Sequence, residues 1–241
     1  MKSVVLGIIT ARGGSKSIPR KNIKLVAGKP LIAWTIEPAL NCHSLNRVIV
    51  STDDAEIEKV SRDWGAEVPF LRPAELAQDN SPHVDVIVHA IEWLMTNENY
   101  CPDYIVLLQP TSPLRTAQDI DAAVALALQK DSDCVVSVSE SPAHPYLNKR
   151  ITEEGKLVDF VDTPKGYLPR QSFPPAYFVN GAIYLARRDV LLRERTWYTD
   201  RTYPYIMSPE HSLDIDTPWD MYLADLVLRD RQGRSASSCK E

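Results

Sequence analysis

The sequence predicts an α/β protein with a doubly wound, mostly parallel β-sheet. Through the first half of the chain, apolar β-branched runs alternate with helical patterns. This alternation favours a parallel sheet that is covered by helices on both faces. The chain has 241 residues, of which 44% are hydrophobic and 24% charged, an ordinary globular composition with enough length to bury a full core.

Strands are expected at five apolar runs, which lie at residues 3–10, 47–51, 67–70, 104–109 and 133–139. Helical patterns fill the gaps, at residues 30–40, 55–64, 84–96 and 117–129. Two of these helices have capping signals, because Asp54 precedes the second, and Thr116 with Asp119 resembles a capping box for the fourth. Pro38 is expected to kink or shorten the first helix.

The pattern changes between residues 142 and 175. Prolines at 142, 145, 164, 169, 174 and 175 break any long element there, while residues 149–151 and 157–161 are compatible with a short hairpin. We interpret this segment as an insertion on the sheet, forming a lobe or an oligomer contact. A strand at 177–186 and a helix at 218–229 follow. The polar residues 231–241 are expected to form a flexible tail.

The composition argues against several classes of protein. No apolar run approaches the roughly 18 residues of a membrane span, and the N-terminus enters a strand without a cleavage site. The cysteines at 42, 101, 134 and 239 are too far apart for a zinc site or a small disulfide scaffold, which favours reduced thiols and a cytoplasmic location. The net charge of −5 argues against a nucleic-acid surface.

Positive charge is concentrated near the N-terminus. The first thirty residues hold seven basic side chains and no acidic ones, and Arg12, Lys16 and Lys21 follow the first strand around Gly13-Gly14. In doubly wound sheets ligands bind at the carboxyl ends of the strands. The two glycines allow backbone N–H groups to face one centre, so we predict a polyphosphate-binding loop. It matches neither the Walker A nor the dinucleotide fingerprint, and the alternative is a solvated basic turn.

A second candidate site is Asp214-Ile215-Asp216-Thr217-Pro218. In an extended segment alternate side chains share a face, so both aspartates are expected to point one way and Ile215 the other. Two carboxylates together with substrate phosphates suit Mg²⁺. The alternative is that Asp216 caps the helix that begins near Pro218.

Two further segments carry polar side chains near strand ends. In Gln109-Pro110-Thr111-Ser112-Pro113-Leu114-Arg115 two prolines are expected to hold Gln109, Thr111 and Arg115 in place, although a purely structural turn explains the prolines equally well. Later in the chain, Arg170 is suited to clamp a carboxylate, and Asn180 precedes a glycine and is positioned to present its amide to a polar ligand.

These motifs together resemble the acylneuraminate cytidylyltransferases (CMP-sialic acid synthetases). The resemblance rests on Ala11-Arg12-Gly13-Gly14-Ser15-Lys16 with Ile18-Pro19-Arg20-Lys21-Asn22, on the segment from Gln109 to Arg115, and on Asp214 to Pro218, and it runs in order from residue 3 to about residue 228. Enzymes of this family couple CTP to a nine-carbon 2-keto sugar acid, giving a CMP-sugar and pyrophosphate.

The resemblance implies a Rossmann-like nucleotidyltransferase domain over residues 1–230, a homodimer built through the insertion at 142–175, and dependence on Mg²⁺. It implies that the triphosphate is held by Arg12, Ser15, Lys16 and Lys21, with Asn22 near the nucleotide. Nucleotide recognition is implied for Arg72 and Ser81, and metal binding for Asp214 and Asp216. The implied sugar pocket is lined by Gln109, Arg170, Gln171, Tyr177 and Asn180. Catalysis is then expected to rest on Arg12, Lys16, Lys21, Asp214 and Asp216.

Two positions depart from the family pattern. Ser17 stands where the family usually has glycine, and Trp219 stands where an acidic residue is common. Other functions remain open at this point: a cytidylyltransferase for legionaminic, pseudaminic or a Kdo-like acid, a glycosyltransferase that uses Asp-x-Asp for its metal, and a non-catalytic nucleotide-binding module.

Overall fold

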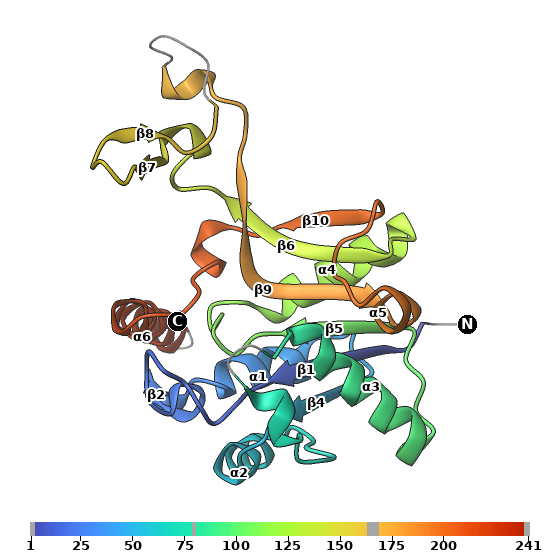
Figure 1. Cartoon of the computed structure of the whole chain (residues 1–241). Helices are drawn as coiled ribbons and strands as arrows, with labels where there is room; N and C mark the ends of the chain where they lie inside the picture. Colours follow the sequence, from blue (N-terminus) through green and yellow to red (C-terminus); the bar gives the residue numbers. More distant parts are fainter. Residues whose placement is uncertain (1–2, 79–80, 163–168, 239–241) are drawn as a thin grey trace.

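A six-stranded sheet forms the centre of the protein in the computed structural model, which describes residues 3–78, 81–162 and 169–238 (Figure 1). The strand order is β10-β6-β9-β5-β1-β4. The bounds are β1 Val5–Thr10, β4 Arg47–Ser51, β5 Tyr104–Leu108, β6 Cys134–Glu140, β9 Tyr177–Arg187 and β10 Thr202–Ile206. Only β9 runs antiparallel to its neighbours β5 and β6 within this sheet. The predicted fold class, a mostly parallel α/β sheet, is confirmed.

Helices cover both faces of the sheet, as the alternation predicts. They are α1 Ala33–Asn41, α2 Ala55–Asp63, α3 His83–Glu98, α4 Ala117–Lys130, α5 Arg188–Glu194 and α6 Pro218–Ser238. Along β1, Val5 and Ile9 pack in one buried cluster with α1, α2 and α4. Leu6 and Ile8 face the opposite side and pack with α3 and α5. Alternate side chains of β1 thus pack into two separate hydrophobic cores, one on each face of the sheet.

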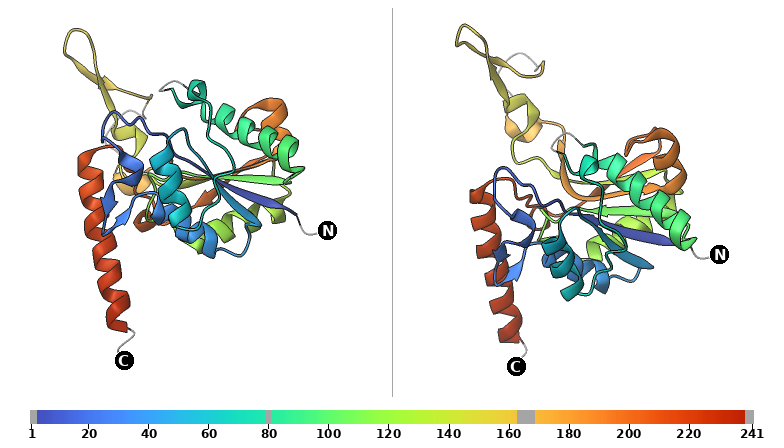
Figure 2. Two further views of the ribbon diagram at one scale, coloured as in Figure 1. Left: turned by 90° about the horizontal axis from the view of Figure 1, so that it is seen from below. Right: turned by 60° about the horizontal axis from the view of Figure 1, so that its bottom comes forward.

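Helix α6 lies beside the sheet and packs on the N-terminal hairpin (Figure 2). That hairpin joins β2 Leu25–Val26 to β3 Lys29–Pro30 through Ala27 and Gly28, which both have positive φ, as tight hairpin turns require. The Ala27 N–H donates to Asp225 on α6 at 2.7 Å. A third apolar cluster, which includes Ile18 and Ile215, therefore ties both predicted ligand-binding segments to α6.

The predicted insertion stands away from the sheet (Figures 1 and 2). Its hairpin, β7 Lys149–Ile151 with β8 Leu157–Asp159, confirms the expected short strands. Ile151, Leu157 and Phe160 are 74%, 69% and 65% exposed, so their apolar surface is uncovered within one chain. Residues 163–168 of this segment, including the predicted breaker Pro164, lie outside the described residues.

Some boundaries differ from the sequence predictions. The run at 67–70 makes only isolated bridges to the sheet, at Glu67 and Leu71, and is not a strand; Pro69 interrupts its hydrogen bonding. Strand β10 was not predicted; it contains Pro204, which is tolerated because β10 is an edge strand. Helix α6 continues to Ser238, so the start of the polar tail was placed too early. Residues 239–241 lie outside the described residues.

The predicted helix caps are confirmed. Asp54 accepts hydrogen bonds from the N–H groups of Glu56 and Ile57 at the start of α2, and Thr116 forms a capping box with Asp119 at the start of α4. Pro38 lies inside α1, which is only 9 residues long. Within the described part of the chain, no helix combines the length and apolarity needed to cross a membrane.

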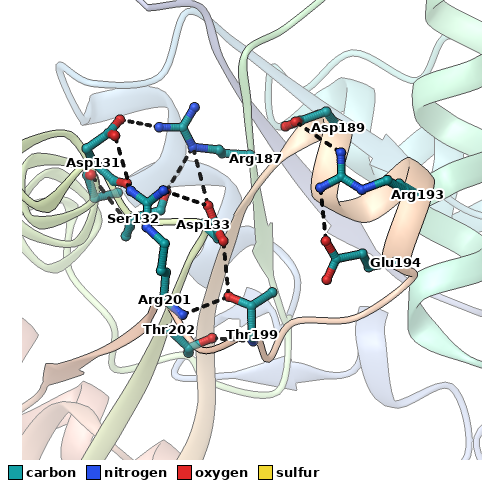
Figure 3. A network of polar contacts seen from close by, with 11 residues as sticks. Asp131, Ser132, Asp133, Arg187, Asp189, Arg193, Glu194, Thr199, Arg201 and Thr202 are labelled. Atoms are coloured by element: carbon teal, nitrogen blue, oxygen red, sulfur yellow. Dashed lines mark hydrogen bonds and ion pairs between the residues drawn. The ribbon is translucent and has the colours of Figure 1, made fainter.

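An ion-pair network fixes the end of the sheet opposite the predicted ligand loops (Figure 3). Asp131 and Asp133, in the turn before β6, face Arg187 at the end of β9 and Arg201 before β10. Arg187 Nε also donates to the Ser132 carbonyl at 3.2 Å. The antiparallel direction of β9 brings its last residue to the amino ends of the other strands, where this network holds it.

Candidate active site

A cleft with a volume of about 410 Å³ lies at the carboxyl ends of β1 and β5. Most of the site residues predicted from the sequence line it, although they come from distant parts of the chain. They are Arg12, Ser15, Lys16, Lys21, Asn22, Arg72, Ser81, Gln109, Asp214 and Asp216. Thr111, which the sequence analysis singled out with Gln109, lines it as well, whereas several further lining residues were not placed in the site from the sequence: Thr10, Ser17, Leu76, Gln78, His83, Val86 and Pro110.

The basic loop after β1 is packed against the turn between β4 and α2. The Ala11 N–H donates to the Ser51 carbonyl at 3.0 Å, and the Gly13 N–H donates to Asp53 Oδ1 at 3.2 Å. A Cβ at Gly13 would lie 2.6 Å from Asp54 Oδ2, so only glycine fits this contact. The Gly13 N–H therefore faces Asp53.

The cations of this loop divide into two groups. Arg12, Lys16 and Lys21 line the cleft, as predicted. Arg20 instead pairs with Asp54 at 2.6 Å and with Glu56 at 2.5 Å on the outer side. Because Arg20 pairs with these carboxylates and does not line the cleft, the loop places positive charge in the cleft through Arg12, Lys16 and Lys21.

Lys21 and Asn22 connect the basic loop to the rest of the cleft. Lys21 begins a short 3₁₀ turn, and its Nζ donates to the Ile215 carbonyl at 2.8 Å and lies 3.6 Å from Asp216 Oδ1. The Asn22 Nδ2 donates to the Arg12 carbonyl at 3.0 Å, which fixes the backbone of the loop. The Lys21 ammonium group therefore links the basic loop to the segment that carries the two aspartates.

The aspartate pair has the alternating arrangement that the sequence predicts. Ile215 is fully buried in the cluster under α6, whereas Asp214 and Asp216 both line the cleft. The alternative, that Asp216 caps α6, is wrong. Thr217 Oγ1 accepts from the Asp220 N–H at 3.3 Å, and Asp220 Oδ2 accepts from the Thr217 N–H at 2.7 Å, so these two residues form the cap.

The two carboxylates have different surroundings. The Asp216 side chain is 78% exposed, while Asp214 Oδ1 is buried without a hydrogen-bond partner. Burial raises the pKa of Asp214 above its usual range, and the nearby Asp216 charge raises it further, although a hydrogen bond from Thr111 and the charge of Lys21 oppose this. A buried carboxylate oxygen without a hydrogen-bond partner is suited to bind a cation.

These residues fit a hard divalent cation that also binds substrate. Among the described residues, no group of three or more His, Cys, Asp or Glu side chains is positioned to hold a metal. Mg²⁺ characteristically takes one or two protein carboxylates and completes its shell with water and substrate phosphates. Asp214 and Asp216, next to a loop that is suited to polyphosphate, provide that kind of incomplete site.

The Gln109 segment combines a site residue with a structural one. Gln109 lines the cleft, but Arg115 is only 2% exposed and donates to the carbonyls of Gln109 at 3.3 Å and Ala182 at 2.6 Å. Arg115 also donates to Thr35 Oγ1 at 2.7 Å. Burial lowers the pKa of Arg115 to about 9, which still leaves it charged at neutral pH. This segment therefore contains one residue that lines the cleft, Gln109, and one buried residue with a structural role, Arg115.

Arg72, Ser81 and His83 also line the cleft. Arg72 is 6% exposed, and burial lowers its pKa, although Asp53 at 3.4 Å opposes this effect. Ser81 Oγ donates to the Glu75 carbonyl and accepts from the Gln78 N–H. His83, the first residue of α3, was not singled out from the sequence; burial and the charges of Arg72 and Arg12 lower its pKa.

Three predicted sugar-binding residues do not line this cleft. Gln171 and Tyr177 are exposed; Gln171 lies within the insertion, and Tyr177 is the first residue of β9. Asn180 is 2% exposed, and its amide is bonded to Ser137 and Ser212, so its place is structural, contrary to expectation. The side chain of Arg170 lies outside the described residues.

Most of the chain is similar in sequence to known proteins. The cytidylyltransferase family model matches residues 6–234. N-acylneuraminate cytidylyltransferase of Streptococcus agalactiae serotype V is 38% identical over 94% of this chain and 55% of its own length. The chain thus spans about half the length of that relative. CMP-N,N'-diacetyllegionaminic acid synthase of Legionella pneumophila is 35% identical over 93% of this chain and 96% of its own length.

The fold comparison agrees with the sequence comparison. The structure of CMP:2-keto-3-deoxy-manno-octonic acid synthetase complexed with CTP superposes with a TM-score of 0.71 at 19% identity, covering 95% of this chain and all of that one. The motifs that suggested the resemblance line one cleft, and the family match covers nearly all of the chain. The chain therefore belongs to the cytidylyltransferase family.

Proposed function

We propose that this protein transfers CMP from CTP to the anomeric hydroxyl of a nine-carbon 2-keto sugar acid, N-acylneuraminate or a relative, and releases pyrophosphate. The observation that carries this proposal is a single cleft that Arg12, Lys16 and Lys21 line together with Asp214 and Asp216. Such a cleft suits a nucleoside triphosphate, whose negative charge needs both cationic side chains and a divalent cation.

The reaction follows from this placement of charge. The anomeric oxygen attacks the α-phosphorus of CTP, and the bond to the oxygen that bridges the α- and β-phosphorus breaks. Arg12 and Lys16 stabilise the negative charge that develops on the departing pyrophosphate. Lys21, fixed by the Ile215 carbonyl, holds a positive charge between the two halves of the site. Alignment of the reactants and charge neutralisation supply the catalysis, as in phosphoryl transfer generally.

Asp214 and Asp216 are the residues that would hold Mg²⁺. When bound, Mg²⁺ would neutralise phosphate oxygens and lower the pKa of the attacking hydroxyl. Support for this assignment comes from the unpartnered Asp214 Oδ1 and from the separate capping of α6 by Thr217 and Asp220, which leaves the Asp216 carboxylate available. Chelation should abolish activity, and added Mg²⁺ or Mn²⁺ should restore it, since both are cations that oxygen ligands suit.

Replacement of the cleft cations tests the function itself. Arg12→Ala and Lys21→Ala should each lower turnover with CTP at least about tenfold, because each removes a charge-assisted hydrogen bond to the triphosphate. Lys59→Ala is the control, since Lys59 is an exposed lysine of α2 that pairs only with a surface carboxylate. The readout is pyrophosphate released from CTP in the presence of a sugar acid. CTP binding without any release would indicate a non-catalytic nucleotide-binding module instead.

The identity of the sugar acid needs a direct assay. Relatives named for neuraminic, legionaminic and pseudaminic acids are 38%, 35% and 33% identical to this chain, differences too small to favour one substrate. A panel of N-acylneuraminate, legionaminic, pseudaminic and Kdo-like acids, each with CTP and Mg²⁺, should give one preferred value of kcat/KM. Our proposal requires a nine-carbon acid to be that substrate.

We also propose that the enzyme is a homodimer joined through the insertion at 142–175. The exposed Ile151, Leu157 and Phe160 support this, because they form an apolar surface that one chain leaves in water. Light scattering should then report a mass near twice 27.1 kDa, and Leu157→Asp should shift the protein towards monomer. A stable, active wild-type monomer at micromolar concentration would refute the dimer.

A further inference from the structure

Asp53 lies behind the cleft, in the turn that follows β4, and does not line the cleft itself. Its Oδ1 atom accepts the Gly13 N–H at 3.2 Å and lies 3.4 Å from Nη2 of Arg72. One carboxylate oxygen thus contacts both the basic loop after β1 and the buried Arg72, which also lines the cleft.

The backbone around Asp53 makes the same connection. The Ala11 N–H donates to the Ser51 carbonyl at 3.0 Å, and the Arg72 N–H donates to the Thr52 carbonyl at 2.7 Å. The end of β4 therefore lies between the two segments that form the cleft walls. Asp53 is the next residue along the chain, and its side chain continues these contacts beyond the last backbone hydrogen bonds.

Charge explains why a carboxylate is suited to this position. Arg72 is almost completely buried, its Nε has no hydrogen-bond partner among the described residues, and the nearby Arg12 repels it. A guanidinium in such surroundings needs a compensating negative charge. The Asp53 side chain, only 24% exposed, provides that charge with limited screening by solvent.

The adjacent Asp54 has a different role. It caps α2 through two backbone N–H groups and pairs with Arg20, which points away from the cleft. Asp54 packs against Gly13, since a Cβ at that glycine would lie 2.6 Å from Asp54 Oδ2. The two neighbouring aspartates therefore have separate roles: Asp54 caps α2, and Asp53 contacts Gly13 and Arg72.

We propose that Asp53 is a positioning residue that holds the phosphate loop and Arg72 in their nucleotide-binding arrangement. This inference rests on the proposed use of CTP. Its contact with the Gly13 N–H fixes the loop that would receive the β- and γ-phosphates. Its contact with Arg72 fixes the side chain that would receive the nucleoside monophosphate part. Asp53 touches neither substrate, so it acts through these two partners.

Two substitutions separate the two contacts. Asp53→Asn keeps a carbonyl oxygen for the Gly13 N–H but removes the charge beside Arg72, whereas Asp53→Ala removes both. Asp63→Asn is the control, because it removes a negative charge from the exposed end of α2 without contact to the cleft. Binding of CTP, CMP and pyrophosphate is measured by calorimetry, and hydrogen exchange at the Gly13 amide is measured in the ligand-free protein.

We expect Asp53→Asn to weaken CMP binding about five- to tenfold and to change pyrophosphate binding by less than about twofold. Asp53→Ala should weaken both ligands and speed exchange at Gly13, while Asp63→Asn should behave as the wild type. Wild-type CMP affinity in the Asn variant, or unchanged exchange at Gly13 in the Ala variant, would overturn the inference. Failure of the wild type to bind CTP would refute the proposed function instead.

Discussion

Replacing Asp214 by Asn should make the ligand-free protein more stable. In the wild type the buried Oδ1 has no partner, and both burial and the Asp216 charge raise the pKa of this carboxyl. The ionised form is therefore costly to bury, and Asn keeps its shape without its charge. An unpartnered buried polar group costs about 1–3 kcal/mol. Since Asn removes the charge but not every polar atom, a gain of about 1 kcal/mol is expected.

The gain should depend on pH in a defined direction. The folded pKa of Asp214 lies above its unfolded value. Below the unfolded pKa of about 3.9 the carboxyl is protonated in both states, and the wild type has its full stability. As the pH rises through the folded pKa, the carboxyl ionises while it is buried, and the wild type loses stability. The Asn variant has no such loss. The stability difference should be near zero at about pH 4 and largest at neutral pH.

Thermal denaturation in a chelating buffer measures this difference. For a protein of this size, about 1 kcal/mol corresponds to a rise in Tm of about 2–4 °C at pH 7. With CTP and Mg²⁺ present the order should reverse, since ligands that bind the folded wild type add stability that the variant largely lacks. An Asn variant that is less stable than the wild type at pH 7 without ligand, or a difference that does not change with pH, would refute the reasoning.

Three other substitutions have expected outcomes. Arg115→Met should lower the free energy of unfolding by about 2–4 kcal/mol in urea denaturation, because the carbonyls of Gln109 and Ala182 lose their donor; an unchanged midpoint would show that the buried charge contributes nothing. Thr217→Val should cost about 1 kcal/mol by the same measurement through loss of the α6 cap, and a neutral effect would return the capping role to Asp216. Gly13→Ala should impair CTP binding in calorimetry, since its Cβ would lie 2.6 Å from Asp54 Oδ2, and wild-type affinity would mean that the loop adapts at little cost.

The sequence by itself determined the fold class, the position of the basic loop and the pairing of the aspartates. Each of these depends on local chain geometry. Alternation of apolar runs with helical patterns predicts a covered parallel sheet, and the carboxyl ends of its strands meet at one edge. The two-residue period of an extended segment places Asp214 and Asp216 on the cleft side, with Ile215 buried opposite.

Only the tertiary structure decided which polar residues line the cleft and which are buried in structural contacts. Arg115, Asn180 and Asp53 carry no local signal that separates them from the residues lining the cleft. Arg115 is buried because carbonyls from β9 and the Gln109 turn converge on it, and Asn180 because Ser137 and Ser212 surround its amide. Asp53 acquires its two partners only when the β1 loop and Arg72 are brought to the end of β4. Such contacts join residues far apart in the chain, so their energies depend on packing that no local pattern records.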